Sequence, residues 1–434
     1  MSRLLGIIAD DLTGGANDSG VQLTEKGVKT SVLFDIPEHS HNLDSGLVID
    51  TNSRALSNQE ARSITKQAAL FLKEAGYRYV YKKMDSTLRG HIATELQALS
   101  EVFSPEFVII APALPAYGRT TKDGVHYVNG IKLSETEAAK DPKHPVRQSY
   151  IPSLIEDEID EAVGLLTTED IKGSTLQAKL QSYQVKNIQY IVCDAESQEE
   201  LLQMAQKVVK ISENIIWAGS AGLAEVLPEV LGISQKMGGK HSLTKSEHVM
   251  TVCGSLSQVT QHQVRFAAEQ ADVTAIELDP IQMFTNDWEM LKDNHIEKCV
   301  DVIKSGDDIV VYVPSNEQIR DKVKRIGRKR DLSDYQIGEH ISQSIGEIVV
   351  GGVSERNKNL SGLVLTGGDT AKEVARQLGG IGFRLLKQLE AGIPVGTLIG
   401  TEKEFRIVTK AGAFGNQQSI YHAMQVLKGV LNNE

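Results

Sequence analysis

The amino-acid sequence predicts an α/β protein of two domains, each built on a mostly parallel sheet with helices on both faces. Short, uniformly apolar runs such as Leu4 to Ala9 are typical of strands that helices cover on both sides. These runs alternate with amphipathic stretches at helical spacing, which is the pattern of parallel βαβ units. The pattern stops in a polar segment, residues 232–247, and then begins again. We therefore expect one domain over residues 1–235 and a second over residues 247–434.

Strands and helices alternate along the first half of the chain. A helix is expected from Asn17 or Asp18 to about Lys26, after a turn of small and polar residues. Residues 115–124 are expected to form an ordered loop, and residues 125–152, which are rich in turn formers, are expected to cover one end of the sheet. The further strands expected here are residues 30–34, 46–50, 77–82, 107–111, 162–166, 188–193 and 215–218, with helices that include residues 58–74 and a segment beginning near residue 91.

The second half repeats this alternation. Residues 385–398 contain Glu390-Ala391-Gly392-Ile393-Pro394, which predicts a tight turn between short extended pieces. A basic cluster, residues 322–330, lies between expected elements, and we interpret it as a solvated loop or helix face. The expected strands are residues 248–253, 273–278, 308–313, 362–365 and 405–409, and the expected helices are residues 258–270, 288–304, 332–350, a segment reaching about residue 378, and the C-terminal segment.

Composition and charge limit the function. The 434 residues are 41% hydrophobic and 24% charged, as is usual for a globular protein. No apolar run approaches the ~20 residues of a membrane helix, and the first strand is too short and acidic for a signal peptide, so we expect a cytoplasmic protein that binds no membrane. The formal net charge of −11 argues against nucleic acid as a partner. The three cysteines lack CxxC spacing, which predicts core residues rather than disulfides or metal ligands.

Two carboxylates, Asp10 and Asp11, follow the first strand directly. In open α/β sheets, ligands bind beyond the carboxyl ends of the strands, where the amides of the next helix begin. Gly14 and Gly15 then allow the backbone to approach a bound group closely. A plain alternative is that one aspartate only caps the next helix. Because capping requires a single such residue and this turn offers two, together with Thr13, we favour a functional site.

The polar strand ends differ between the two halves. Those of the first half are charged: Asp10-Asp11, Asp50 with Arg54, and Lys82-Lys83 with Asp85-Ser86. Those of the second half are small and rich in backbone amides: Gly254-Ser255, Thr366-Gly367-Gly368-Asp369 and Lys410-Ala411-Gly412. Cations with carboxylates suit a small polyhydroxylated acid, whereas amide-rich turns at helix N-termini suit polyphosphate. We therefore expect a substrate domain followed by a nucleotide domain.

Together these segments resemble the four-carbon acid sugar kinases over essentially the whole chain. The resemblance implies an enzyme that transfers the terminal phosphate of ATP to the 4-hydroxyl of threonate, erythronate or 3-oxo-tetronate. It also implies an N-terminal substrate domain and a C-terminal nucleotide domain, in agreement with the turns. The segments that carry it are Ala9-Asp10-Asp11-Leu12-Thr13-Gly14, Lys83-Met84-Asp85-Ser86-Thr87-Leu88-Arg89-Gly90, Gly118-Arg119-Thr120-Thr121, Gly254-Ser255-Leu256-Ser257, Thr366-Gly367-Gly368-Asp369-Thr370 and Lys410-Ala411-Gly412-Ala413-Phe414-Gly415.

The resemblance assigns roles to individual residues. It places the acid sugar on Asp11, Arg54, Lys83, Met84, Asp85 and Ser86. It places ATP on Ser255, Thr366, Gly367, Gly368, Asp369, Thr370 and Gly412. Phosphoryl transfer also needs a carboxylate near the attacking hydroxyl, for which Asp11 and Asp85 are the candidates, and a magnesium ion, which Asp369 could hold directly or through water. Asp369 departs from the family pattern, where glutamate is more frequent, but keeps the charge.

The predicted reaction converts D-threonate to 4-phospho-D-threonate. Residues 118–127 and the Asp141-Pro142 segment look closer to the threonate branch of the family than to the oxo-acid branch. D-erythronate, L-threonate and 3-oxo-tetronate stay open as substrates, and a homodimer stays open as the assembly. Two other classes are weighed: a nucleotide-dependent dehydrogenase, which the missing GxGxxG run disfavours, and a non-enzymatic sugar-acid binding protein, which would not need a nucleotide.

Overall fold

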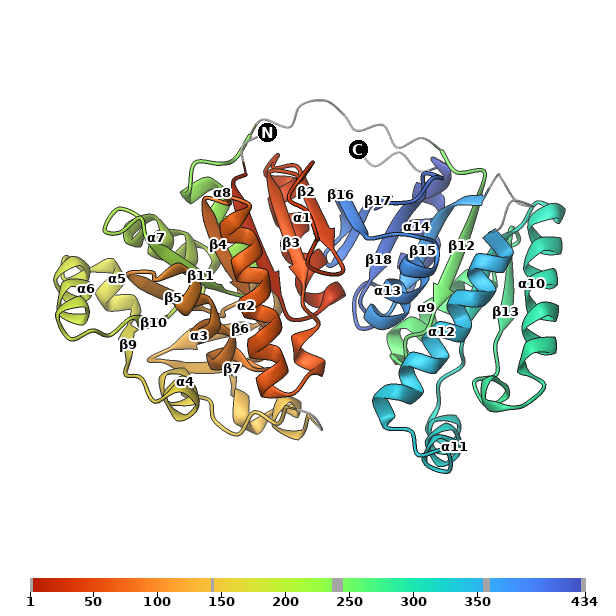
Figure 1. Ribbon diagram of the computed structural model, residues 1–434, viewed down its shortest axis with the longest axis horizontal. Helices are drawn as coiled ribbons and strands as arrows, with labels where there is room; N and C mark the ends of the chain where they lie inside the picture. Colours follow the sequence, from red (N-terminus) through yellow and green to blue (C-terminus); the bar gives the residue numbers. More distant parts are fainter. Residues whose placement is uncertain (1–2, 142–143, 236–244, 354–359, 431–434) are drawn as a thin grey trace. The chain divides into compact units, whose positions relative to one another are not determined.

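The computed structural model describes residues 3–141, 144–235, 245–353 and 360–430, which separate into two compact units (Figure 1). The first unit spans Met1–Gly238 and the second spans Gly239–Glu434. Part of the predicted boundary segment, residues 236–244, lies outside the described residues, so the bounds at 235 and 247 stay predictions. Each unit contains a mostly parallel sheet with helices, which confirms the predicted fold class. Among the described helices, none has the length and apolar character needed to cross a membrane.

The strands of the first unit are hydrogen-bonded in the order β2-β3-β1-β4-β11-β5-β10-β9, and all of these pairs are parallel. Every residue of β1, β3 and β5 is buried, as uniformly apolar runs predict. The strands expected in this half are confirmed, with small shifts at their ends. Their bounds are β1 Leu5–Ala9, β2 Thr30–Leu33, β3 Gly46–Asp50, β4 Tyr79–Lys83, β5 Phe107–Ala111, β9 Val163–Leu166, β10 Tyr190–Cys193 and β11 Ile215–Gly219.

Helices cover both faces of this sheet. From β1 the chain crosses toward β2, whereas from β3 it crosses back over β1 to β4. Because parallel crossovers are right-handed, these opposite directions place α1 and α2 on opposite faces. α2 begins at a capping box formed by Ser57 and Glu60. The helices are α1 Asp18–Glu25, α2 Asn58–Glu74, α3 Ile92–Phe103, α4 Ile151–Ile159, α5 Thr168–Lys172, α6 Leu176–Val185, α7 Gln198–Val208 and α8 Ala221–Val230.

A small antiparallel sheet is formed by β6 Arg119–Lys122, β7 Val125–Val128 and β8 Ile131–Lys132. The expectation of a loop over residues 115–124 is therefore wrong for residues 119–122, whereas the cover expected of residues 125–152 stays a prediction. Two-residue turns, Asp123-Gly124 and Asn129-Gly130, connect the strands, and all four turn residues have positive φ. Asp-Gly and Asn-Gly are preferred in type I′ turns, whose twist matches that of a hairpin. The signal for this sheet was thus present in the sequence.

The second unit orders its strands as β13-β14-β12-β15-β18-β17-β16. The pairs from β13 to β18 are parallel, whereas β17 pairs with β18 and β16 in antiparallel fashion. The strands are β12 His248–Cys253, β13 Val273–Glu277, β14 Asp308–Tyr312, β15 Leu360–Thr366, β16 Gly382–Glu390, β17 Ile393–Ile399 and β18 Arg406–Lys410. The helices are α9 Gln258–Ala268, α10 Trp288–Ser305, α11 Glu317–Arg328, α12 Asp334–Val353, α13 Gly368–Gln377 and α14 Ser419–Lys428.

Two segments of this unit extend the sequence-based expectation. The tight turn predicted within residues 390–394 is confirmed, because Ala391-Gly392, with Gly392 at φ 72°, connects β16 and β17, and these strands are longer than the short pieces expected. Most of the basic cluster, residues 322–330, lies in helix α11, which the sequence pattern did not predict because the helix has few apolar positions. Asn316 caps it by accepting a hydrogen bond of 2.9 Å from the amide of Ile319.

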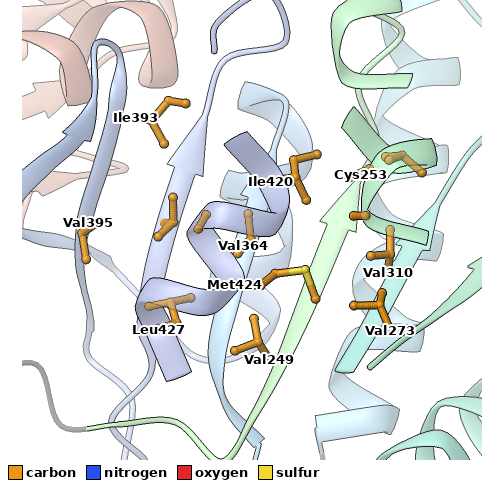
Figure 2. Close-up of a cluster of buried hydrophobic side chains, with 14 residues drawn as sticks. Val249, Cys253, Val273, Val310, Val364, Ile393, Val395, Ile420, Met424 and Leu427 are labelled. Atoms are coloured by element: carbon orange, nitrogen blue, oxygen red, sulfur yellow. The ribbon is translucent and has the colours of Figure 1, made fainter. Parts of the chain in front are cut away.

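The core of the second unit forms where α14 packs on the sheet (Figure 2). Ile420, Met424 and Leu427 recur at helical spacing and therefore share one face of α14. They belong to one buried cluster with Val249 of β12 and with Cys253. All three cysteines of the chain are free and buried, as predicted.

A buried ion pair lies below the carboxyl edge of the first sheet. Lys82 Nζ is 3.2 Å from Glu95 Oε2, and their side chains are only 1% and 3% exposed. Glu95 also accepts hydrogen bonds from the hydroxyls of Ser53 and Thr65. Because a charge without a partner is costly in the interior, each member of the pair depends on the other. The pair therefore links β4, α3 and the turn after β3.

We expect Glu95→Gln to lower the free energy of unfolding by about 3 to 5 kcal/mol, because it removes the ion-pair partner of the buried Lys82 ammonium. The double variant Lys82→Met with Glu95→Gln should recover most of this loss. Urea unfolding is followed by tryptophan fluorescence in a Trp288→Phe background. Trp217, the other tryptophan of the chain, then reports on the first unit alone. Equal losses in the single and double variants would show that the ion pair is not the cause.

Candidate active site

The candidate residues of the first unit gather beyond the carboxyl ends of β1, β3 and β4, which are neighbours in the sheet. Asp10 and Asp11 follow β1. Asp11 is the N-cap of a short π-helix, Leu12–Asn17, and its Oδ2 accepts a hydrogen bond of 3.2 Å from the amide of Gly14. The helix-capping alternative is thus correct for Asp11, but it accounts for only one of its oxygens and for neither oxygen of Asp10.

Arg54 joins the two aspartates. It lies in a single 3-10 turn, Ser53–Ala55, which follows β3. Its Nε donates to Oδ2 of Asp10 at 2.8 Å, and its Nη2 donates to Oδ1 of Asp11 at 2.9 Å. Burial acts to raise the pKa of Asp10, but the charges of Arg54 and of the two lysines that end β4 outweigh burial and lower this pKa. Asp10 is therefore an anion at neutral pH.

The end of β4 brings Lys83 and Asp85 to the same edge. The Nζ of Lys83 donates to the carbonyl of Gly14 at 3.3 Å. In the loop that follows, the guanidinium of Arg89 donates to both oxygens of Asp85, at 2.6 and 3.3 Å. Burial acts to raise the pKa of Asp85, but Arg54 and then Arg89 lower this pKa well below its usual range. The structure therefore brings the predicted acidic and basic residues of this unit together, and adds Arg89 to them.

The other predicted substrate residues, Met84 and Ser86, are tied to neighbouring elements through their backbone. Met84 has a buried side chain, and its amide donates to the carbonyl of Gly219 at 2.9 Å. The carbonyl of Ser86 accepts a hydrogen bond of 2.9 Å from Nε2 of His126 in β7. Burial lowers the pKa of His126 to about 4, so the ring is neutral, and its Nδ1 accepts from the hydroxyl of Thr121 at 3.0 Å. Sequence reasoning missed His126 because it missed the hairpin.

In the second unit, a pocket of about 330 Å³ lies beyond the carboxyl ends of β12 and β15. The turns Gly254–Leu256 and Gly367–Thr370 line it. A mainly apolar lining with a few polar groups is usual for a small-molecule site. Arg320 and Lys324 of α11 also line it, and the basic side chains of residues 322–330 are exposed, as the predicted solvated helix face requires. The apolar lining residues are Leu256, Pro280, Val313, Pro314, Ile319, Val323, Ile337 and Ile341.

Three tight turns of this unit meet around Ser255. A Cβ atom added to Gly412 would lie 2.3 Å from Ser255 Oγ, and one added to Gly254 would lie 2.0 Å from Thr370 Oγ1. Gly367 has φ 89°, a conformation that favours glycine. Side chains larger than hydrogen would therefore collide at these turns. The structure brings together Ser255, Gly367, Gly368, Thr370 and Gly412 as predicted.

Thr366 and Asp369 differ in exposure. Thr366 is fully buried at the end of β15 and is not among the residues that line the pocket. Asp369 is exposed in the first turn of α13 and lines the pocket beside the glycine turns. In the described residues, no three His, Cys, Asp or Glu side chains lie together as a metal site. A single carboxylate still fits a magnesium ion that phosphates and water hold for the most part, which is usual for this ion.

Comparison with known proteins identifies the class of protein that this fold and site define. Residues 5–227 match the family of the sugar-binding N-terminal domain, and residues 250–420 match that of the nucleotide-binding C-terminal domain. The chain is 31% identical to a D-threonate kinase of Salmonella typhimurium, over 97% of this chain and 98% of the relative. It is 27% identical to a D-erythronate kinase of Heliobacterium modesticaldum (99% and 98%) and 28% identical to a 3-oxo-tetronate kinase of Haemophilus influenzae (97% and 99%).

A solved structure of a Haemophilus influenzae protein has the same fold, with a TM-score of 0.77, 26% identity, and coverage of 97% of this chain and 100% of that one. The class is that of a kinase with a sugar-binding and a nucleotide-binding domain. The chain belongs to the four-carbon acid sugar kinase family, and it is a sugar-acid kinase. The predicted family and enzyme class are confirmed, and the dehydrogenase and binding-protein alternatives are wrong.

Asp18, the first residue of α1, is a further carboxylate in this region. Burial raises the pKa of Asp18 to about 6, and the charge of Lys83 opposes only part of this shift. Because this pKa lies above the ordinary value of 3.8, the folded state binds the proton more tightly than the unfolded state does. The free energy of unfolding is therefore expected to fall as the pH rises from about 4 to about 6.

We expect Asp18→Asn to raise the free energy of unfolding at pH 7 by roughly 1 to 3 kcal/mol, because the amide has no charge to bury. At about pH 4 the substitution should change little, since Asp18 is already protonated there in the folded state. Urea unfolding at the two pH values measures the difference. A gain of the same size at both would show that the charge of Asp18 is not what destabilises the native protein.

Proposed function

We propose that the enzyme transfers the terminal phosphoryl group of ATP to the 4-hydroxyl of D-threonate, with 4-phospho-D-threonate as the product. The observation that carries this proposal is the cluster of cations and carboxylates beyond β1, β3 and β4. Cations suit the carboxylate of a sugar acid, and carboxylates suit its hydroxyls. The match of this unit to a sugar-binding domain supports the assignment. The cluster consists of Asp10, Asp11, Arg54, Lys83 and Asp85.

Lys83 is the cation best suited to bind the substrate carboxylate. Among the described residues, its Nζ makes one hydrogen bond, the long contact of 3.3 Å to the carbonyl of Gly14. Because an ammonium group carries three donors, two are left for a ligand. Arg54 already donates to Asp10 and Asp11, so we assign it to holding these carboxylates and adding positive charge.

Asp11 is the better candidate for the carboxylate that receives the proton of the hydroxyl. Its side chain is 26% exposed, so a ligand can reach it. Both aspartates accept hydrogen bonds on each oxygen, but the Asp85 side chain is only 12% exposed and accepts a further hydrogen bond from the hydroxyl of Thr87 beside those from Arg89. The low pKa of Asp85 also makes it a weak proton acceptor. We therefore assign Asp85 to fixing the loop that carries Ser86.

The pocket of the second unit supports ATP as the phosphoryl donor. Apolar residues such as Val313 and Ile341 offer a packing surface for a base, and the amides at the start of α13 offer donors for phosphates. The match of residues 250–420 to a nucleotide-binding domain agrees with this assignment. Asp369 would hold magnesium through water, and the bound ion would offset negative charge on the phosphates.

We expect Asp11→Asn to lower kcat by about two to four orders of magnitude, the range typical of a lost general base. A coupled assay of ADP release measures kcat with D-threonate, ATP and magnesium. Thermal unfolding of the same variant accounts for the hydrogen bonds that Asp11 makes to Gly14 and Arg54.

Asp85→Asn is the matched control for this experiment. Because Asp85 is assigned to the loop, the variant should lose thermal stability and raise KM for the acid more than it lowers kcat. Near-normal turnover of Asp11→Asn, with a large loss of kcat in Asp85→Asn, would contradict our assignment and exchange the two roles.

D-threonate is proposed over other acids on two grounds. One D-threonate kinase relative is 31% identical and two others are 27% identical, against 27% for a D-erythronate kinase and 28% for a 3-oxo-tetronate kinase. Residues 118–127 also resemble the threonate branch, whereas Pro142 of the second threonate-like segment lies outside the described residues. A site built to hydrogen-bond a hydroxyl rejects an isomer that misplaces it, since buried polar groups are then left unpaired.

We therefore expect kcat/KM for D-threonate to exceed the values for L-threonate, D-erythronate and 3-oxo-tetronate by about tenfold or more. The coupled ADP assay with these four acids measures the ratios directly. A tenfold advantage for another acid would show that our substrate is wrong while the enzyme class holds. If none of the four acids leads to ADP release, the proposed reaction itself is wrong.

A further inference from the structure

Lys410, the last residue of β18, is a fully buried lysine to which the proposed reaction gives no role. Its side chain is 1% exposed. Burying an ammonium group is costly unless hydrogen bonds replace those it made to water. The hydrogen-bond partners of the Lys410 ammonium therefore indicate which part of the structure it stabilises.

The partners are carbonyl oxygens of the loop that Lys410 itself begins. Its Nζ donates to the carbonyls of Ala411, Gly412 and Phe414 at 2.9, 3.1 and 2.9 Å. The hydroxyl of Thr260, in α9, lies 3.3 Å from the same Nζ and donates to the carbonyl of Gly412 at 2.9 Å. One buried cation thus gathers three carbonyls of a short loop, and α9 supplies a second donor to one of them.

The direction of these carbonyls sets the direction of the amides. A trans peptide group points its N–H opposite to its carbonyl, and the described chain has no cis peptide bond. The amides of Gly412, Ala413 and Gly415 share peptide groups with the three carbonyls, so they point away from Lys410. Within the described residues, none of these three amides donates a hydrogen bond. Because the carbonyls converge on Lys410, the three amides turn outward, and each is left to donate to a group outside the loop.

This loop is also joined to the other turns of the pocket. The amide of Gly367 donates to the carbonyl of Lys410 at 3.1 Å. Gly412 abuts Ser255, since a Cβ atom added to it would lie 2.3 Å from the serine oxygen. Loop 411–415 therefore lies next to the turns that line the pocket.

We propose that Lys410 is a positioning residue for the nucleotide: its ammonium holds the carbonyls of loop 411–415 inward, so that the unpaired amides of the loop stay turned outward, where a phosphate group accepts from them. Lys410 does not contact the phosphate, and acts through the backbone of the loop. The inference rests on the proposed function, because it takes the nucleotide to bind beside Gly412.

The test compares ligands that differ only in their phosphates. ADP, AMP and adenosine are titrated calorimetrically into the full chain and into Lys410→Met. We expect the variant to bind ADP roughly tenfold or more weakly, AMP less affected, and adenosine as the wild type does, because only phosphates use the amides. A uniform loss for all three ligands, or no loss for ADP, would overturn the proposal.

Thr260→Val keeps the test decisive if Lys410→Met does not fold, which thermal unfolding shows. This variant removes one donor to the carbonyl of Gly412 and leaves the ammonium in place. We expect this variant also to lose most affinity for ADP, less for AMP and none for adenosine, but each loss should be smaller than in Lys410→Met. An effect independent of the number of phosphates would contradict a positioning role.

Ile341→Ala is the matched control, because Ile341 lines the apolar part of the pocket. It should weaken ADP, AMP and adenosine equally. If it weakens none of them, the proposed nucleotide pocket is wrong. If it weakens all three while Lys410→Met leaves ADP binding unchanged, the pocket stands and the inference about Lys410 fails.

The pH dependence of ADP binding gives a second readout. Burial lowers the pKa of Lys410 to about 8, and the negative charge of the nearby Glu390 opposes part of this shift. Burial raises the pKa of the Cys253 thiol to about 12, so this group stays neutral. ADP affinity of the wild type should therefore fall between about pH 7.5 and pH 9.5, as Lys410 loses its charge. Lys410→Met should show a flat profile, and an equal fall in both proteins would contradict the proposal.

Discussion

The ion pairs of Arg54 with Asp10 and Asp11 are the constraint on which the site of the first unit depends. Parallel strands deliver their polar ends to one edge of the sheet, which places two consecutive carboxylates side by side. The negative charges of the two carboxylates repel each other, and a cation between them offsets this repulsion. The planar fork of Arg54 reaches both carboxylates, at 2.8 and 2.9 Å, and one ammonium point charge would not fix both with the same geometry. The turn after β1 and the turn after β3 are thereby held together.

The candidate sites of the two units present different kinds of groups to anions. The first uses charged side chains, and supports them from below with the buried pair of Lys82 and Glu95, which also holds Ser53, the neighbour of Arg54. The second uses backbone amides at glycine turns, where a side chain would collide with Ser255 or Thr370. The direction of a backbone amide depends on the conformation of its loop. A buried cation such as Lys410 can fix that direction by binding the carbonyl of the same peptide group, because the carbonyl and the amide point in opposite directions.

The parts of the fold and of the candidate site that could be predicted are those that depend on residues close together in the sequence. Uniform apolar runs gave the strands, and the residues that follow them gave Asp10, Arg54 and the glycine turns. What could not be predicted is the choice of partner, which depends on strand order and packing. In sequence, Asp85 is as good a candidate base as Asp11; the structure separates them, because Arg89 and Thr87 hold Asp85 and its side chain is less exposed. Lys410 looked like part of an amide-rich turn, and its burial depends on α9, far away in sequence.

The charges of the first unit's site also bear on how it selects a substrate. The carboxylates of Asp10, Asp11 and Asp85 lie with the cations of Arg54, Lys83 and Arg89, and Asp18 adds a further carboxylate nearby. Net charge therefore does not distinguish one four-carbon acid from another, since these acids carry the same carboxylate. Selection must come from where hydroxyls meet fixed donors and acceptors. The loop around Ser86 is fixed by Asp85 and by the neutral ring of His126, so a change in the hairpin that carries His126 would move this loop without altering any charged residue of the site. Relatives with the same charged cluster can thus act on different acids.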